Sequence, residues 1–222
     1  MAPRDLHRMA FVQALMDSLF MQEDKCKMLF ARIVGRPLDT ALEAQYSQTL
    51  KDLNDQMGFA KFKIKTVKSP VDNKKYVGFV NTNVDEPSKL GSRYSLAQRD
   101  LFKQAMECIS QSSCIAGSNG APCASQMELL NLGNRSANFQ TTIANSSQAG
   151  PSTQAAAASN KPLSKREIED TLHHLTKDGW LAGAPSKPGY LCLGVRTFLE
   201  LNAYLMALQL PDETRAAWEV VL

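Results

Sequence analysis

The chain has 222 residues, which suits one large domain or two small ones. Its hydrophobic fraction of 44% and charged fraction of 21% are those of a globular protein, and they exclude a fibrous or wholly disordered chain. The net charge of +3, from 25 basic and 22 acidic residues, excludes a histone-like coat for nucleic acid but permits a local basic patch.

Hydropathy and cysteine usage indicate the compartment. No apolar run approaches the roughly 18 residues of a membrane span, so we expect no membrane association, and the N-terminus lacks the unbroken apolar stretch of a signal peptide. The cysteines are odd in number and widely scattered, which is typical of a reducing compartment, the cytosol or the nucleus. They are Cys26, Cys108, Cys114, Cys123 and Cys192.

Residues 4–57 have the spacing of three amphipathic helices. The second helix ends at Gly35 and Pro37, which are common helix stop residues. The third begins at Thr40, which together with Glu43 predicts a capping box. In the first helix apolar residues recur mostly every three or four positions, which predicts one wide buried stripe of Leu6, Met9, Ala10, Val12, Leu15, Met16 and Leu19.

A change of period after the third helix predicts a β-hairpin. Residues 61–65 alternate strictly between lysine and apolar side chains, which is the pattern of a half-buried strand. A turn at 69–73 leads to a return strand at 76–80. Three helices followed by a two-stranded hairpin is the element order of a winged helix, a variant of the helix-turn-helix.

The middle of the chain predicts two further helix starts separated by a loop. Ser95 with Gln98, and Ser125 with Glu128, have the spacing of capping boxes. The Ser-, Gly- and Ala-rich segment between these helices, at 111–124, predicts a loop.

Residues 134–162 differ in composition from the rest. Their only charges are Arg135 and Lys161, and they cannot bury enough apolar area to offset the entropy of ordering, so they predict a disordered insert. Ser-Gln and Thr-Gln pairs begin at Ser147 and Thr153, as in sites of damage-response kinases, but simple polar low complexity is the preferred interpretation.

The remaining segment repeats the order of helix and hairpin. Ser164 and Glu167 predict a capping box, and the helix that follows buries one face at Ile168, Leu172 and Leu175. A hairpin then follows with strands at 180–181 and 190–193, and a last helix covers 195–210.

These elements predict a mostly α fold with small β-hairpins, an α+β class with two tandem winged-helix domains. The first domain covers 1–90, and a connecting helix and loop covers 91–124. The second covers 125–210 and is interrupted by the insert at 134–162. Residues 211–222 are predicted to form a truncated lead-in to a further domain that is missing from this chain.

No pattern for metal binding or catalysis is present in the sequence. Zinc ligands occur in pairs two to four residues apart, whereas no CxxC exists here and the adjacent His173 and His174 would point in different directions on a helix. The chain also lacks GxSxG, P-loop and Rossmann glycine patterns. We therefore predict no catalytic residue, no bound metal and no cofactor in this chain.

A basic hairpin is the first candidate for DNA contact. It carries one acid, Asp72, and its lysines are suited to phosphate contacts that give affinity without reading sequence. A solvated strand that lysine protects from edge aggregation is the simpler alternative. The six lysines are Lys61, Lys63, Lys65, Lys68, Lys74 and Lys75.

The helix that starts after Ser164 is the second candidate. Lys165 and Arg166 lie at its N-terminal end, where a recognition helix usually contacts the groove. The acids that follow would repel phosphates, so protein binding is the preferred interpretation of this module and DNA contact the alternative. These acids are Glu167, Glu169 and Asp170.

Four stretches resemble the non-structural maintenance of chromosomes element 1 family, a subunit of the Smc five/six genome-maintenance complex. They are RDLHRMAFVQALM at 4–16, EDKCKMLFARI at 23–33, SKREIEDTLHHLTKDGWL at 164–181 and GYLCLGVRTFLELNAYL at 189–205. The resemblance covers most of the chain outside the predicted insert.

The resemblance implies a tandem winged-helix subunit that binds a MAGE-type winged-helix partner and, with it, a kleisin. It implies a nuclear protein that helps to hold DNA during repair by homologous recombination. Family members also carry a C-terminal RING-like zinc domain linked to ubiquitin transfer, and this chain ends at Leu222, about where those zinc ligands should begin. This chain alone is therefore expected to be inactive as a ligase and to need no zinc.

Two alternatives stay open. A product that extends past Leu222 into the RING would act with a ubiquitin-conjugating enzyme as a ligase component. A winged-helix transcription regulator unrelated to Smc complexes would bind DNA tightly and selectively, which the acidic helix at 165–177 disfavours.

Overall fold

The computed structural model describes residues 3–82, 93–116, 121–132 and 163–219. It is mostly helical with two small antiparallel sheets, which confirms the predicted α+β class. The predicted insert at 134–162, with Ser147 and Thr153, lies outside the described residues. Among the described residues, no helix is long and apolar enough to span a membrane.

The three predicted N-terminal helices are confirmed as α1 (Pro3–Ser18), α2 (Glu23–Val34) and α3 (Thr40–Met57). They meet around three buried rings that pack edge to face. The ring centroids of Phe11 and Phe30 are 5.2 Å apart, and that of Tyr46 lies 5.7 Å from Phe30. Such aromatic pairs add about 0.5–1.5 kcal/mol beyond the burial of their area.

Two predictions for these helices are wrong. The N-cap of α3 is Asp39, whose carboxylate accepts from the backbone N–H of Leu42, so the capping box at Thr40 does not form. The wide buried stripe of α1 is wrong in large part, because the helix buries Leu15 of that stripe together with Phe11, which lies outside it, and leaves much of the stripe in solvent. The exposed members are Leu6, Met9, Met16 and Leu19.

The first sheet contains one strand that the sequence did not reveal. The predicted first helix ends early at Ser18, Leu19 takes a left-handed φ of 60°, and β1 (Phe20–Gln22) follows. β1 pairs antiparallel with β3 (Lys75–Asn81), which also pairs with β2 (Phe62–Lys68), so the strand order is β1-β3-β2. The hairpin predicted from 61 to 80 is thereby confirmed.

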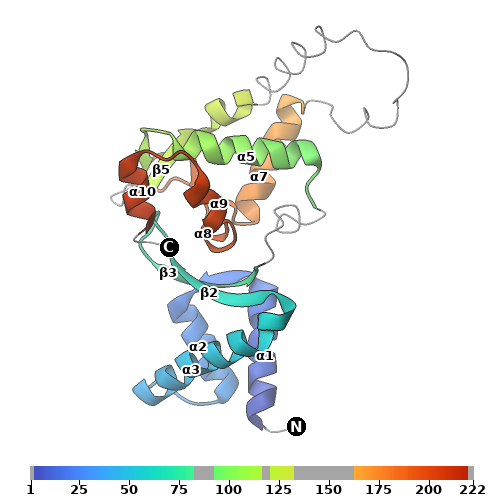
Figure 1. Cartoon of the computed structure of the whole chain (residues 1–222), viewed down its shortest axis with the longest axis vertical. Coiled ribbons are helices and arrows are strands. Elements are labelled where there is room, and N and C mark those ends of the chain that lie inside the picture. The colour runs from blue at the N-terminus through green and yellow to red at the C-terminus, as the bar shows by residue number, and fades with distance from the viewer. Residues whose placement is uncertain (1–2, 83–92, 117–120, 133–162, 220–222) are drawn as a thin grey trace, which may run out of the picture.

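The sheet β1-β3-β2 buries apolar residues on both faces. Ile64 and Val77 face the core of α1, α2 and α3. Val67 and Val80 face the core of the second half of the chain. Figure 1 shows the strands between these two groups of helices.

The second half opens with α5 (Leu96–Ser110), which has the predicted capping box of Ser95 and Gln98. α7 (Lys165–Lys177) likewise has the predicted box of Ser164 and Glu167. The pair Ser125 and Glu128 is bonded in the same reciprocal way before the helical residues 126–132.

The second sheet has the order β4-β5-β7-β6. β6 (Leu181–Gly183) and β7 (Tyr190–Leu193) form the predicted second hairpin. The loop predicted at 111–124 is wrong in part, because β4 (Ile115–Ala116) and β5 (Ala121–Ser125) lie within it. Small Ala, Cys and Ser residues give little periodic contrast, so these strands could not be recognised by pattern.

The last predicted helix is divided in the structure. α8 (Val195–Glu200) and α9 (Asn202–Ala207) meet at Leu201, and α10 (Asp212–Glu219) follows where the sequence predicted only a lead-in. The side chains of α5, α7, α8 and α10 share one core with Trp180. The winged-helix assignment and the domain limits remain predictions.

Glycine lets the two halves approach closely. A Cβ at Gly78 in β3 would lie 2.6 Å from Cδ1 of Leu199 in α8. A Cβ at Gly179 would lie 2.5 Å from the ring of Phe20 in β1, and Gly179 also needs its left-handed φ of 79°. The first sheet is therefore the surface on which the second half packs.

Candidate functional site

The six lysines of the predicted basic hairpin do not share one face. Strictly opposed residues in the β2–β3 register lie on the same side, and Lys65 opposes Gly78, where α8 packs. The Nζ of Lys65 lies 3.5 Å from the carbonyl oxygen of Leu199, so this lysine binds the second module. Lys63 lies on the same face of β2, and both Lys63 and Lys61 are exposed.

The other three lysines gather at the turn of the hairpin. Lys68 lies directly opposite Lys75 in the register, and Lys74 is in the turn. Like charges directly opposite each other in a sheet are unfavourable, so this pair lowers stability unless an anion neutralises it. With a rise of about 3.3 Å per residue, the turn lies about 20 Å from Lys61 and Lys63.

The single acid of the hairpin is already engaged in hydrogen bonds. The hydroxyl of Tyr76 donates to Asp72 over 2.7 Å, and Gln22 donates to that hydroxyl over 3.4 Å. Partial burial, and the bond to Asp72, raise the pKa of Tyr76. Asp72 thus orders the turn, and Lys74 and Lys75 remain exposed beside it.

The second candidate group for DNA contact lies elsewhere. Lys165 and Arg166 are exposed at the N-terminal end of α7, while Gly179, just beyond its C-terminal end, lies against β1. At 1.5 Å per residue that separation is about 20 Å. Because of this separation, Lys165 and Arg166 do not form one basic surface with the hairpin. Glu167, which follows them, bonds the backbone N–H of Ser164 as part of the capping box.

An exposed apolar face of α1 is the feature that sequence analysis missed. Leu6 is 60% exposed, Met9 59% and Met16 52%. At 100° per residue these three side chains fall within about 80° of one another, on the side away from Phe11 and Leu15. A shallow cavity of about 310 Å³ adjoins this face between α1 and α3, and its apolar lining is Met9, Val12, Leu53 and Met57.

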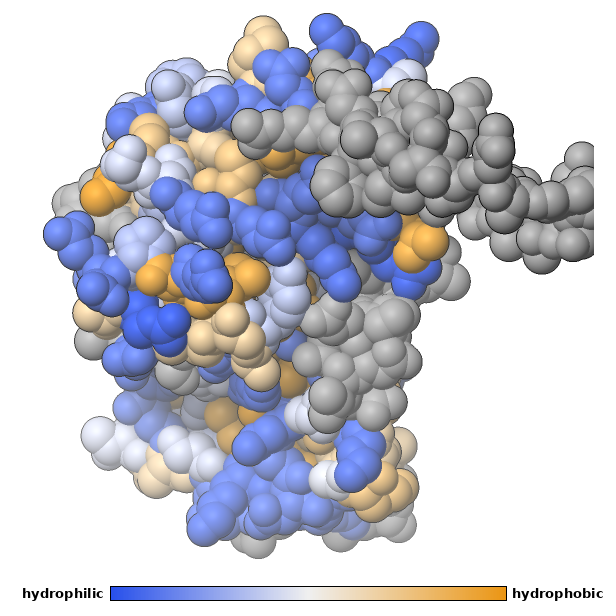
Figure 2. Space-filling view, turned by 45° about the horizontal axis from the view of Figure 1, so that its top comes forward, coloured by the Kyte–Doolittle hydropathy of each residue, from blue (hydrophilic) through white to orange (hydrophobic). Residues whose placement is uncertain are grey.

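Exposed apolar residues outside α1 are more scattered. On the second module they are Leu96, Ile115 and Met127, which belong to three different segments. Figure 2 shows a face that is largely hydrophilic, on which hydrophobic residues occur in small separate groups. Single exposed apolar side chains are normal on soluble proteins, whereas three on one side of a helix, next to an apolar cavity, are a candidate interaction site.

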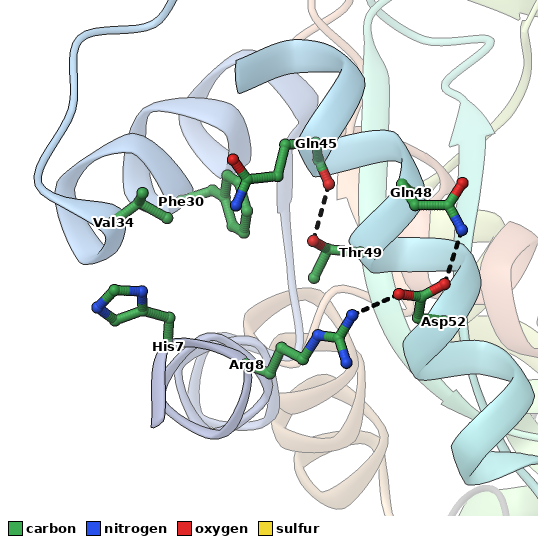
Figure 3. A pocket seen from close by; sticks show the side chains of 8 residues that line it. All are labelled: His7, Arg8, Phe30, Val34, Gln45, Gln48, Thr49 and Asp52. Atoms are coloured by element: carbon green, nitrogen blue, oxygen red, sulfur yellow. Dashed lines mark hydrogen bonds and ion pairs between the residues drawn. The ribbon is translucent and has the colours of Figure 1, made fainter. Parts of the chain in front are cut away.

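A second cavity, of about 340 Å³, lies between α1, α2 and α3 (Figure 3). Arg8 of α1 forms an ion pair with Asp52 of α3, and Gln48 donates to Asp52 over 2.7 Å. The hydroxyl of Thr49 donates to the carbonyl oxygen of Gln45, and the imidazole of His7 points away from the ion pair. The ion pair of Arg8 and Asp52 joins α1 to α3, the bonds of Gln48 and Thr49 lie within α3, and no nucleophile among these side chains meets a base.

Metal sites are also absent from the described part of the chain. No group of three or more His, Cys, Asp and Glu side chains in residues 3–82, 93–116, 121–132 and 163–219 could hold a metal ion. His173 and His174 have ring centroids 6.2 Å apart and no further ligand is grouped with them there. The exposed apolar residues of α1 and the basic turn of the hairpin are therefore the candidate binding surfaces of the described residues.

Comparison with known families identifies the group. Residues 7–201 match the family described as the Nse1 non-SMC component of the SMC5-6 complex, and the chain belongs to that family. A chain from a solved structure titled "Nse1-Nse3-Nse4 complex" has a similar fold, with a TM-score of 0.65 and 21% sequence identity. The similarity covers 91% of this chain and 74% of that one. No curated protein matched this chain.

Proposed function

We propose that this chain is a subunit of the SMC5-6 complex that binds a MAGE-type winged-helix partner and, with it, a kleisin. The family match over residues 7–201 carries this proposal. The similar fold of a chain from an Nse1-Nse3-Nse4 complex supports the same kind of assembly. On this proposal the protein works in the nucleus, in DNA repair by homologous recombination.

The apolar face of α1 is the surface we assign to the partner. Leu6, Met9 and Met16 leave more than half of their side chains in water, which is unfavourable by about 25 cal/mol for each Å² of apolar area that a partner could cover. The adjoining cavity provides a recess in which an apolar side chain of the partner can anchor.

Co-expression with the cognate MAGE-type partner, followed by size-exclusion chromatography, tests the proposal. We expect a stoichiometric complex of the two wild-type chains. The double variant Met9→Glu/Met16→Glu should elute separately from the partner, because it places two charges in the interface. Met127→Glu is the matched control, since Met127 is 67% exposed but lies in the second module.

The outcomes separate the two parts of the proposal. No complex with the wild-type chain would contradict partner binding itself. A complex that survives Met9→Glu/Met16→Glu as well as Met127→Glu would contradict only the assignment of α1. Circular dichroism of each variant confirms that α1 still folds, which we expect because both side chains point to solvent.

A second, weaker function is DNA contact through the turn of the β2–β3 hairpin. The opposed pair Lys68 and Lys75, with Lys74 beside it, is the observation that favours this function, because a phosphate would relieve the repulsion. Replacing all three by glutamate should weaken duplex binding and reduce the slope of log K against log salt by up to about 2.7, at about 0.9 per phosphate contact.

Two charge-reversal variants at other positions control the DNA experiment. Lys61→Glu/Lys63→Glu reverses charge at the far end of β2, and Lys165→Glu/Arg166→Glu does so at the start of α7. An unchanged salt slope in the turn variant, with a loss in either control, would move the contact to that position. Ubiquitin transfer with a RING-like zinc domain stays a prediction from the resemblance, and it concerns a product with zinc ligands after Leu222.

A further inference from the structure

The fold brings together two cysteines that are nine positions apart. β4 and β5 pair with Ile115 opposite Pro122, and this register places Cys114 opposite Cys123. The backbone N–H of Cys123 donates to the carbonyl oxygen of Cys114 over 2.8 Å. The two Sγ atoms are 3.1 Å apart, and both cysteines are free thiols.

This position allows a covalent bond without a change of fold. Residues that oppose each other as a hydrogen-bonded antiparallel pair have Cα atoms about 5.5 Å apart. Disulfides span Cα separations of about 4.4–6.8 Å. The backbone is therefore already placed for a bond between Cys114 and Cys123.

A lysine distinguishes one of the two sulfurs. The Nζ of Lys187, in the turn between β6 and β7, lies 3.2 Å from the Sγ of Cys114. The hydrogen bond with Cys123, and the one from Lys187, lower the pKa of Cys114 against the opposing effect of burial. Burial and the neighbouring sulfur of Cys114 raise the pKa of Cys123 to about 12.

The surroundings assign different roles to the two thiols. Cys114 is half-buried and thus accessible, whereas Cys123 is fully buried behind it. A thiolate that a cation stabilises, next to a second thiol that can resolve it, is the arrangement of redox-sensing cysteines. Among the described residues, Glu128, Tyr190 and Cys192 are further titratable side chains near this group.

The third nearby cysteine is not placed for this role. Cys192 opposes Cys123 in the β5–β7 register, but its thiol donates to the carbonyl oxygen of Ala182. Burial raises the pKa of Cys192 to about 11, and the sulfur that lies 3.1 Å from the Sγ of Cys123 is that of Cys114. Cys114 is therefore the partner of Cys123.

We propose that Cys114 and Cys123 form a reversible oxidation site in which peroxide converts the two thiols into a disulfide between β4 and β5. This inference rests on the geometry of the second sheet and is independent of the proposed function. It requires no metal, and disulfides in reducing compartments are typically transient and redox-sensing ones of this kind.

The reaction balances in two steps. The Cys114 thiolate attacks one oxygen of hydrogen peroxide, the O–O bond breaks, and the hydroxide released takes a proton to form water, leaving Cys114 as a sulfenic acid. The sulfur of Cys123 then attacks the sulfur of Cys114, the S–O bond breaks, and hydroxide leaves with the Cys123 proton as a second water. Two electrons from the two thiols reduce the peroxide, and a dithiol reductant reverses the change.

Thiol counting and peptide mapping of the whole chain test the site. The reduced protein has five free thiols. Treatment with a small excess of hydrogen peroxide should remove two of them and produce one cross-linked peptide that contains Cys114 and Cys123. Dithiothreitol should restore all five thiols, and the oxidised protein should melt several degrees higher than the reduced one because the bond constrains the unfolded chain.

Variants assign the role of each residue. Cys123→Ser should leave Cys114 as a sulfenic acid that dimedone traps, and Cys114→Ser should abolish the disulfide. Lys187→Met should slow oxidation of Cys114 by about threefold for each unit by which the pKa of Cys114 rises, whereas Lys187→Arg should restore the rate. Cys108→Ser, at the other half-buried cysteine, is the matched control and should change nothing.

Three results would overturn the inference. The first is oxidation of Cys114 no faster than that of Cys108 in the wild-type chain. The second is a cross-link between Cys123 and Cys192 that persists in Cys114→Ser. The third is the loss of thiols only through disulfides between two molecules, which non-reducing electrophoresis would show.

Discussion

The two faces of the sheet β1-β3-β2 come from the same strands but bury different parts of the molecule. One face packs on α1, α2 and α3 through Ile64 and Val77. The other receives α8 at Gly78 and carries Lys65, which reaches the backbone of Leu199. The hairpin therefore separates two hydrophobic cores. The alternation of lysines in β2 predicts a face exposed to solvent, but at Lys65 this face contacts α8 instead.

Because both cores pack on the sheet β1-β3-β2, unfolding of either half would expose one face of that sheet, and we expect the two halves to unfold together.

The largest effect should come from a substitution in the second core. Trp180 is 1% exposed, packs on Phe102 with centroids 5.6 Å apart, and lies under the guanidinium of Arg196. Trp180→Ala should lower the free energy of unfolding by about 4–5 kcal/mol, as measured by urea denaturation. A near-wild-type midpoint would contradict this burial.

A matching change in the first core sharpens the comparison. Phe11→Ala removes one of the three buried rings and should cost about 3–4 kcal/mol. We expect it to shift the same single transition that Trp180→Ala shifts. If the protein unfolds in two transitions, and Phe11→Ala shifts one of them while Trp180→Ala shifts the other, the halves unfold independently.

The junction itself can be broken at Gly78. Gly78→Ala places a Cβ 2.6 Å from Leu199, 3.2 Å from the carbonyl oxygen of Leu19 and 3.3 Å from Phe20, so we expect a loss of about 1–3 kcal/mol. Leu199→Ala in the same chain should recover part of that loss, which a double-mutant cycle measures. Gly183→Ala is the control, because its Cβ would meet nothing within 4 Å.

Helix caps test the two halves with a smaller change. Asp39→Ala at α3 and Ser164→Ala at α7 each remove a side chain that accepts from the first turn, and each should cost about 1 kcal/mol. If the two halves unfold as one cooperative unit, each variant should lower the free energy of global unfolding by a similar amount, and the two losses should add in the double variant. Ser164→Asp should keep most of the stability, since aspartate also caps helices.

The smallest predicted effect is a dependence on pH at Asp178. Burial opposes ionisation of this carboxyl, but hydrogen bonds from Tyr94 and Arg93 overcome it and lower its pKa below the ordinary 3.8. A carboxyl with a depressed pKa in the folded state stabilises the protein above pH 3.8, and that stability is lost as the pH falls below it. Asp178→Asn should remove this part of the pH dependence of unfolding between pH 5 and 2.

Much of the local structure was predictable because it depends on neighbours in sequence. The 3.6-residue period found the helices, and the serine caps at 95, 125 and 164 are side-chain-to-backbone bonds within three residues. β1, β4 and β5 were missed because two to five residues of mixed or small side chains carry no period, and each is a strand only through its partner.

The candidate surfaces were less predictable than the elements. The apolar residues of α1 occur on all sides of the helix, so their spacing alone could not show that Phe11 and Leu15 enter the core while Leu6 and Met9 do not. The lysines of the hairpin alternate in sequence, but the alternation ends after Lys65, and Lys68 moves to the other face. The count of charges predicted one basic patch, whereas the sheet places Lys63 and Lys65 on one face and Lys68 and Lys75 on the other.

The sequence by itself determined the α+β class, the order of helices and hairpins, and the family, because periods, caps and family resemblance are all properties of the chain as written. The tertiary structure decided which side of α1 faces solvent, what covers the lysine face of β2, and that Cys114 meets Cys123. The first two depend on contacts between residues far apart along the chain, which packing across a sheet selects by the space left between elements. The third depends on the pairing of β4 with β5, whose mostly small side chains carry no period.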